Sequence, residues 1–121
     1  MVTSSYQGLI VWQKSMELTV EIYNMIKKLP KEETYSLCDQ MKRAAVSIPS
    51  NIAEGHERGT NKEFIHFLTI ARGSRAELET QLQICIKVRY LSEQDISIAM
   101  NLLKEIGNML TSLIHKLTTK T

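Results

Sequence analysis

Glu63 and His66 form the chain's one E-x-x-H motif, the spacing with which di-iron carboxylate proteins place two ligands on one helix face. Those sites need a second E-x-x-H motif from another helix. Ser112 stands three residues before His115, and His56 follows a glycine, so neither histidine completes a set. The sequence therefore predicts no metal site and no cofactor.

Nucleophilic catalysis lacks a recognisable motif as well. The chain has no H-E-x-x-H, and neither "GHERG" nor "RGSR" stands between a strand and a helix as a phosphate-binding loop would. Cys38 and Cys85 are far apart and match no C-x-x-C or zinc spacing, which favours two packed thiols over a disulfide. We predict that the protein is not an enzyme and has no catalytic residues.

Binding through basic side chains is the better hypothesis. The candidates are Lys42 and Arg43 on the second predicted helix, Arg58 at its end, and Arg72 and Arg75 on the third. If these two helices adjoin, the five cations form one basic surface. Such a surface would hold RNA or DNA through its phosphates with little dependence on base sequence.

Two other interpretations stay open. In the first, Arg43 and Arg75 pair with acids such as Glu54, Glu77 and Glu79 and organise subunit interfaces. The formal net charge of a single chain is only +2, so phosphate binding would depend on clustering or on several subunits acting together.

In the second, the protein is an interaction scaffold that docks a ribosomal or reverse-transcriptase-type protein and does not contact nucleic acid. Its docking surface would be apolar or would carry Tyr6, Tyr35 and Tyr90. Tyr23 falls on the predicted core stripe of the first helix and is expected to be buried.

These side chains must be positioned by one domain spanning residues 1–121. Apolar residues make up 43% and charged residues 23% of the chain, which is typical of a globular protein. No run of about 18 apolar residues and no signal-peptide pattern occurs, so we expect no membrane association and a cytoplasmic location.

Apolar spacing predicts helices over about 8–29, 34–56, 61–88 and 93–118, joined by short loops. The predicted core stripe of the first helix is Leu9, Trp12, Met16, Thr19, Tyr23 and Ile26. The fourth helix carries a seven-residue repeat of Ile96, Leu103, Leu110 and Leu117, interleaved with Ala99, Ile106 and Leu113. We therefore predict an all-α fold, an antiparallel up-down-up-down four-helix bundle.

Pro49 lies inside the second helix, where it leaves the Ala45 carbonyl without its N–H partner. The apolar pattern continues past it to Ile52. We therefore predict one helix kinked near Pro49, with Ser47 or Ser50 satisfying the freed backbone.

The helix ends also have recognisable signals. Gly55 and Gly59 are expected to end the second helix, Thr60 and Glu63 to form a capping box, and Ser92 to cap the fourth helix.

The fourth helix has more apolar residues than one core face requires. We therefore expect homo-oligomerisation through side chains outside its repeat, which are Ile98, Met100, Leu102, Met109 and Ile114.

Three segments, "IVWQKSMELTVEIY", "QMKRAAVSIPSNIAEGHER" and "FIHFLTIARGSRAELETQL", resemble the bacterial 23S rRNA intervening-sequence proteins. The resemblance covers nearly the whole chain. It implies a four-helix bundle that assembles into a ring, a homopentamer, without established catalytic activity. A more distant resemblance, to the accessory variability-determinant proteins of diversity-generating retroelements, implies binding of nucleic acid and a reverse transcriptase.

Overall fold

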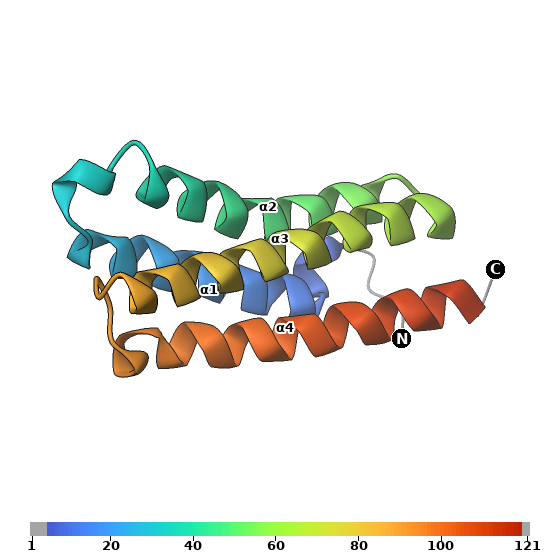
Figure 1. The fold of residues 1–121 in the computed structure, drawn as a ribbon. Helices are drawn as coiled ribbons and strands as arrows, with labels where there is room; N and C mark the ends of the chain where they lie inside the picture. Colours follow the sequence, from blue (N-terminus) through green and yellow to red (C-terminus); the bar gives the residue numbers. More distant parts are fainter. Residues whose placement is uncertain (1–4, 120–121) are drawn as a thin grey trace.

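The computed structural model describes residues 5–119 and contains four long helices within that range. They are α1 (Ile10–Met25), α2 (Leu37–Glu57), α3 (Asn61–Lys87) and α4 (Glu93–Thr119). Short 3-10 turns flank α1 and precede α2, at Tyr6–Gly8, Ile26–Lys28 and Lys31–Glu33. The helices lie side by side with alternating direction (Figure 1). The predicted all-α four-helix bundle is confirmed.

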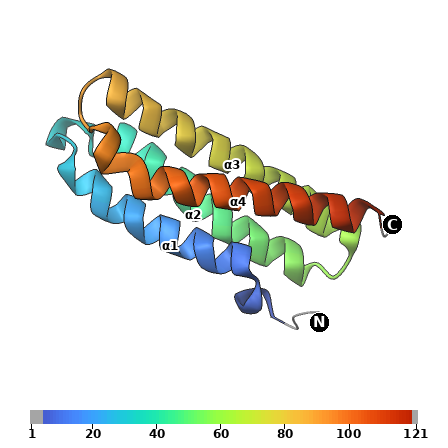
Figure 2. The same ribbon diagram turned by 90° about the horizontal axis from the view of Figure 1, so that it is seen from below.

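Each helix packs against two neighbours. Both α1 and α3 contact α2 and α4, and Figure 2 shows α4 lying across the space between α1 and α3. The groove between α1 and α2 is therefore on the opposite side of the bundle from the groove between α3 and α4. This arrangement decides which surface side chains can act together.

The core runs through all four helices and is formed mainly by branched aliphatic side chains. Twelve large side chains are less than 2% exposed: Leu18, Ile22, Met41, Ile48, Ile52, Leu68, Leu78, Leu82, Ile96, Leu103, Ile106 and Leu110.

The core stripe predicted for the first helix is wrong at Met16 and Tyr23, whereas its Ile26 is buried and its Leu9 and Trp12 pack against the core. Met16 and Tyr23 are 41% and 42% exposed, whereas the buried stripe is Val11, Ser15, Leu18, Ile22 and Met25. Both stripes have three- and four-residue spacing, because α1 is apolar around most of its circumference.

The second helix continues through Pro49 without interruption, from Leu37 to Glu57. The Thr19 hydroxyl of α1 lies 3.3 Å from the Ala45 carbonyl freed by Pro49, and it shares its proton between this carbonyl and the Ser15 carbonyl of its own helix, at 2.8 Å. Ser47, one of the two predicted partners, bonds instead to the Ser74 hydroxyl of α3 at 2.8 Å. A neighbouring helix, not a local serine, therefore satisfies the carbonyl.

Replacing Thr19 with valine should lower the free energy of unfolding by about 1 kcal/mol, because it leaves the Ala45 carbonyl without this donor. Urea unfolding followed by circular dichroism would measure it. Thr69→Val is the matched control, since the exposed Thr69 hydroxyl bonds only within its own helix, to the Ile65 carbonyl. Equal effects of the two substitutions would contradict the interhelical role.

The α2–α3 connection differs from prediction in one glycine. Gly55 lies inside α2 and is buried, so it does not end the helix. Gly59 follows the helix and has a φ of 88°, a conformation that favours glycine. Thr60 Oγ1 accepts from the Glu63 amide at 3.2 Å, which confirms this half of the predicted capping box.

The α3–α4 connection is closed by a reciprocal cap. The Asp95 amide donates to Ser92 Oγ at 3.1 Å, and the Ser92 amide donates to Asp95 Oδ2 at 2.9 Å. Lys28 reaches Asp95 Oδ1 at 3.0 Å and ties the end of the α1 segment to this turn. The prediction of Ser92 as N-cap is confirmed.

Both cysteines are free and buried, as predicted. Burial raises the pKa of the Cys85 thiol to about 11, so Cys85 stays protonated at neutral pH. Among the helices of residues 5–119, none combines the length and apolar character needed to cross a membrane.

Candidate nucleic-acid interface

The five predicted cations fall in three places on the bundle, although α2 and α3 do pack together. Lys42 and Arg43 lie at the α1–α2 groove, Arg72 and Arg75 line the α3–α4 groove, and Arg58 lies at the α2–α3 connection. The predicted single basic surface is therefore wrong. Four of the five cations lie in two grooves on opposite sides of the bundle, and Arg58 lies apart from both.

At the α1–α2 groove, the two cations have different surroundings. Arg43 Nε donates to Asp39 Oδ2 at 2.9 Å, and this hydrogen bond raises the pKa of Arg43. Lys42 Nζ lies 5.5 Å from the ring centre of Tyr23 and has no ion-pair partner among residues 5–119. The groove has a volume of about 490 Å³ and includes Val46 in its wall.

Arg58 is engaged by its neighbours. Its Nη2 donates to Glu54 Oε2 at 2.7 Å, its Nε is 3.9 Å from Glu63 Oε2, and its guanidinium lies 5.1 Å from the Phe67 ring centre. The bond to Glu54 raises the pKa of Arg58. The guanidinium ties the end of α2 to the first turns of α3, so its charge is largely offset locally.

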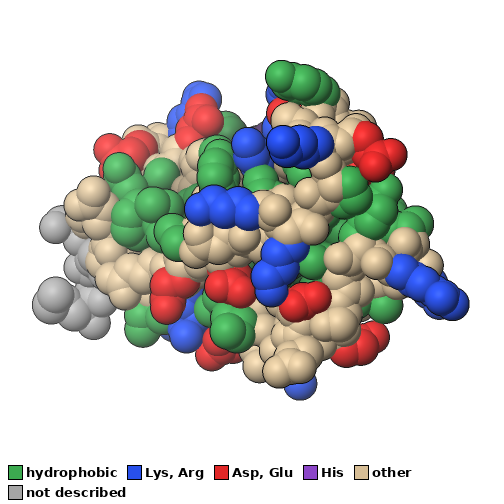
Figure 3. Space-filling model, turned by 90° about the vertical axis from the view of Figure 1, so that its left-hand side faces the viewer, with side chains coloured by type: hydrophobic (Ala, Val, Ile, Leu, Met, Phe, Trp, Pro, Cys, Tyr) green, Lys and Arg blue, Asp and Glu red, His purple; other side chains and the backbone are tan. Residues whose placement is uncertain are grey.

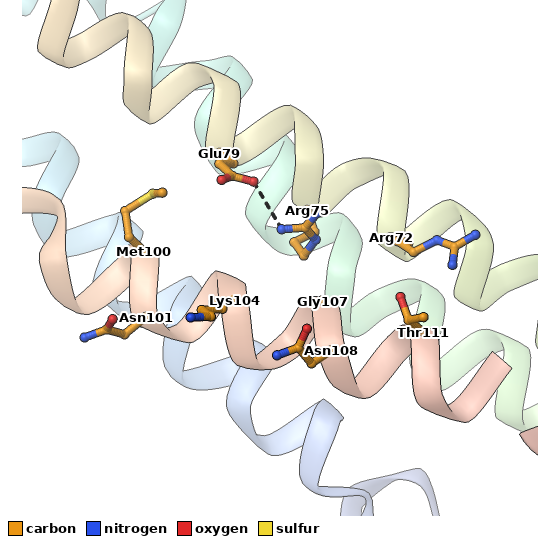
Figure 4. Close-up of a pocket in the computed structure, with 9 residues that line it drawn as sticks. All are labelled: Arg72, Arg75, Glu79, Met100, Asn101, Lys104, Gly107, Asn108 and Thr111. Atoms are coloured by element: carbon orange, nitrogen blue, oxygen red, sulfur yellow. Dashed lines mark hydrogen bonds and ion pairs between the residues drawn. The ribbon is translucent and has the colours of Figure 1, made fainter. Parts of the chain in front are cut away.

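The α3–α4 groove brings together three cations, of which one is paired. It has a volume of about 420 Å³ and is lined by Arg72, Arg75, Glu79, Met100, Asn101, Lys104, Gly107, Asn108 and Thr111 (Figure 4). Arg75 Nη1 donates to Glu79 Oε1 at 3.2 Å. Arg72 and Lys104 form no ion pair with any residue in 5–119. The groove therefore has three cations against one carboxylate.

Four polar residues of α4 complete this groove and were absent from the sequence predictions: Asn101, Lys104, Asn108 and Thr111. A signal for them was present, because steps of three, four and three residues place them on one helix face. What the sequence did not show is that this face lies opposite Arg72 and Arg75.

The predicted ion-pair alternative is partly realised. Arg75 pairs with Glu79 as expected, whereas Arg43 pairs with Asp39 and Glu54 pairs with Arg58. Each pair joins residues four apart on one helix. At the end of the bundle that carries the α1–α2 and α3–α4 connections, basic and acidic side chains lie next to each other (Figure 3).

Glu63 and His66, the only metal-ligand motif in the sequence, are both exposed in the first turns of α3. Over residues 5–119, no group of three or more His, Cys, Asp or Glu side chains is placed to hold a metal ion. Glu63 instead faces Arg58.

Comparison with known proteins decides the family. The model of the 23S rRNA-intervening sequence protein family matches residues 7–112, which is most of the chain. The chain belongs to this family. The resemblance seen in the sequence segments is thereby confirmed, whereas the link to accessory variability-determinant proteins stays a prediction. No curated protein matches the chain.

A solved structure from the S23 ribosomal protein family supports the same assignment. It is a Bacteroides thetaiotaomicron VPI-5482 protein described as having unknown function. The two chains are 31% identical with a TM-score of 0.80, and the match covers 87% of this chain and 98% of the other. The solved structure therefore supports the four-helix fold. Neither comparison names a catalytic family.

Proposed function

We propose that this family member is a non-catalytic homo-oligomer that binds ribosomal RNA through basic side chains of its two grooves. The observation that carries the proposal is the α3–α4 groove, where Arg72 and Lys104 have no acidic partner in residues 5–119 and Arg75 lies between them. Unpaired cations gathered in a concave surface attract phosphates. The name of the matching family makes ribosomal RNA the first nucleic acid to test.

Self-association would strengthen weak phosphate contacts. A homopentamer, the ring that the family resemblance implies, would have a formal charge of 5 × (+2) = +10 and would repeat each groove five times. Exposed apolar side chains support association: Met16, Val20 and Tyr23 lie along one face of α1 and are 41–60% exposed. On α4, Ile98 is 59% exposed, whereas Met100, Leu102, Met109 and Ile114 pack against the core.

The second candidate function is a scaffold that binds a ribosomal or reverse-transcriptase-type protein without touching nucleic acid. Tyr35 favours it, since this side chain is 94% exposed beside the α1–α2 connection. The other two tyrosines are occupied: Tyr90 donates to Glu33 at 2.8 Å, and the Tyr6 ring packs edge-on against Trp12.

Fluorescence anisotropy with a labelled 23S ribosomal RNA hairpin and a scrambled RNA would test the proposal, with oligomer mass recorded on the same sample. We expect binding by an oligomer that weakens steeply between low and physiological salt. Glutamine at the four groove positions should weaken binding at low salt by at least about thirtyfold, because charge-assisted contacts to phosphates are lost. The four positions are Lys42, Arg43, Arg72 and Arg75.

The matched control removes the same charge elsewhere. Glutamine replaces four exposed lysines that form no ion pair within residues 5–119, which are Lys27, Lys31, Lys62 and Lys87. This control should retain most of the affinity. Absence of RNA binding by the wild-type protein at low salt would reject the proposal and favour the scaffold. Equal losses in both variants would show that net charge, and not the grooves, attracts RNA.

A further inference from the structure

We infer that the α3–α4 groove is a built phosphate site, in which Arg72, Arg75 and Lys104 hold one phosphate group of the RNA strand between the two helices. The inference rests on the proposed function, because it takes the phosphate from RNA. It adds three features to the general proposal: one phosphate held between the two helices, neutral polar groups of α4 around it, and a carboxylate that competes with it.

The α3–α4 groove has an excess of positive charge. Arg72 and Arg75 come from α3 and Lys104 from α4, so cations face the groove from both sides (Figure 4). Glu79 is the only acid in the groove lining, which leaves a formal charge of +2. The nearby acid of α4, Glu105, points to the other side of its helix and pairs with Lys14 at 3.3 Å. Among residues 5–119, no acidic side chain forms an ion pair with Arg72 or Lys104.

Arg75 packs directly against the backbone of α4 at Gly107. A Cβ at Gly107 would lie 2.9 Å from Arg75 Nε and 3.1 Å from Cζ, so only glycine lets the guanidinium lie directly on α4. The Arg75 side chain is 22% exposed. Within residues 5–119 its Nε is buried without a hydrogen-bond partner, and its Nη1 donates to Glu79. A cationic donor that is buried without an acceptor raises the free energy of the folded state. Binding of an anion that accepts from this guanidinium is therefore favoured.

Neutral side chains that can form hydrogen bonds also line the groove. Asn101, Asn108 and Thr111 share the α4 face with Lys104 and extend the groove on both sides of Gly107. A volume of about 420 Å³ is in the range of small-ligand sites. A phosphate with part of its adjoining sugar therefore fits, with amide and hydroxyl groups available for the remaining oxygens.

Glu79 sets a condition on binding. Its Oε1 accepts a hydrogen bond from Arg75 Nη1 at 3.2 Å, so an incoming phosphate competes with this carboxylate for the guanidinium. Glu79 is 41% exposed and can swing into solvent. Replacing Glu79 with glutamine should therefore tighten phosphate binding, whereas a purely structural Arg75–Glu79 pair would give no gain.

Single substitutions and two probes test the site, using the full chain, the labelled ribosomal RNA hairpin, and inorganic phosphate followed by amide NMR spectra. Arg72→Gln and Lys104→Gln should each weaken RNA binding about tenfold. Gly107→Ala keeps the charge but displaces the guanidinium, and should weaken it about fivefold. Lys87→Gln, an exposed cation of α3 outside the groove, should change it less than twofold. Phosphate should shift the amides around Lys104 and Asn108.

The outcomes separate this inference from the proposed function. RNA binding that survives Arg72→Gln and Lys104→Gln would overturn the groove site while leaving RNA binding intact. Phosphate shifts in the groove without RNA binding would support the site and show that its phosphate comes from a small molecule. Absence of both would overturn site and function together. Thermal unfolding of each variant, expected within a few degrees of wild type, excludes loss of fold as the cause.

Discussion

Replacing Leu18 with alanine should lower the free energy of unfolding by about 3 kcal/mol. Leu18 is fully buried on α1, at the stripe that faces the bundle interior. The substitution removes its apolar contacts and leaves a cavity that four packed helices cannot close completely. Urea unfolding followed by circular dichroism would give the difference, provided that protein concentration is held constant because an oligomer's stability depends on it.

Met16→Ala is the control for Leu18→Ala, because the two residues are two positions apart on the same helix and both are large and apolar. Met16 is 41% exposed, so its truncation should cost less than about 1 kcal/mol. The sequence-based stripe predicts the opposite order, with Met16 in the core. A larger cost for Met16 than for Leu18 in a monomeric variant would therefore overturn the orientation of α1.

Gly55→Ala should lower the free energy of unfolding by about 2 kcal/mol, despite the better helix propensity of alanine. The new Cβ would lie 2.7 Å from Phe67 Cβ and 3.1 Å from Phe64 Cδ1. The Phe67 Cβ is fixed to the α3 backbone and cannot move aside as a side-chain tip can. The ends of α2 and α3 would have to separate, which would also disturb the Arg58 contacts to Glu63 and Phe67 of α3.

Gly73→Ala is the matched control, since it is also a helical glycine but a Cβ there has no neighbour within 4 Å. The same chemical change should therefore raise stability by about 0.5–1 kcal/mol. Thermal or urea unfolding of both variants measures the contrast. Stabilisation by Gly55→Ala would show that α2 and α3 do not approach as closely as the structure indicates.

The helices themselves could be predicted from the sequence because their signals are local. The apolar period and caps such as Ser92 act within a few residues. The prediction that Gly55 ends α2 was wrong, because this glycine lies inside the helix where α3 packs closely against it. On α4, the seven-residue repeat also identified the core correctly, since its buried residues Ile96, Ala99, Leu103, Ile106 and Leu110 all belong to it. The regular spacing of this repeat keeps its residues on one face of the helix, and that face packs into the core.

The candidate site was only partly predictable for the same reason. The sequence identified Arg72 and Arg75 as candidates. No local sequence pattern around a surface cation predicts which residues of a neighbouring helix will face it. Lys104 and Gly107 are about 30 residues further along the chain and join these arginines only when α3 and α4 pack antiparallel. Lys42 and Arg43 were grouped with them, and the bundle places them on the opposite side.

The sequence by itself therefore determined four helices, their approximate ends, the all-α bundle and the family. The tertiary structure alone decided which of two apolar stripes of α1 is buried, which helix satisfies the carbonyl freed by Pro49, and which cations share a groove. The physical reason is the range of the interactions. Helix formation and capping depend on neighbours in sequence, whereas burial, interhelical hydrogen bonds and charge clustering depend on residues that only packing brings together.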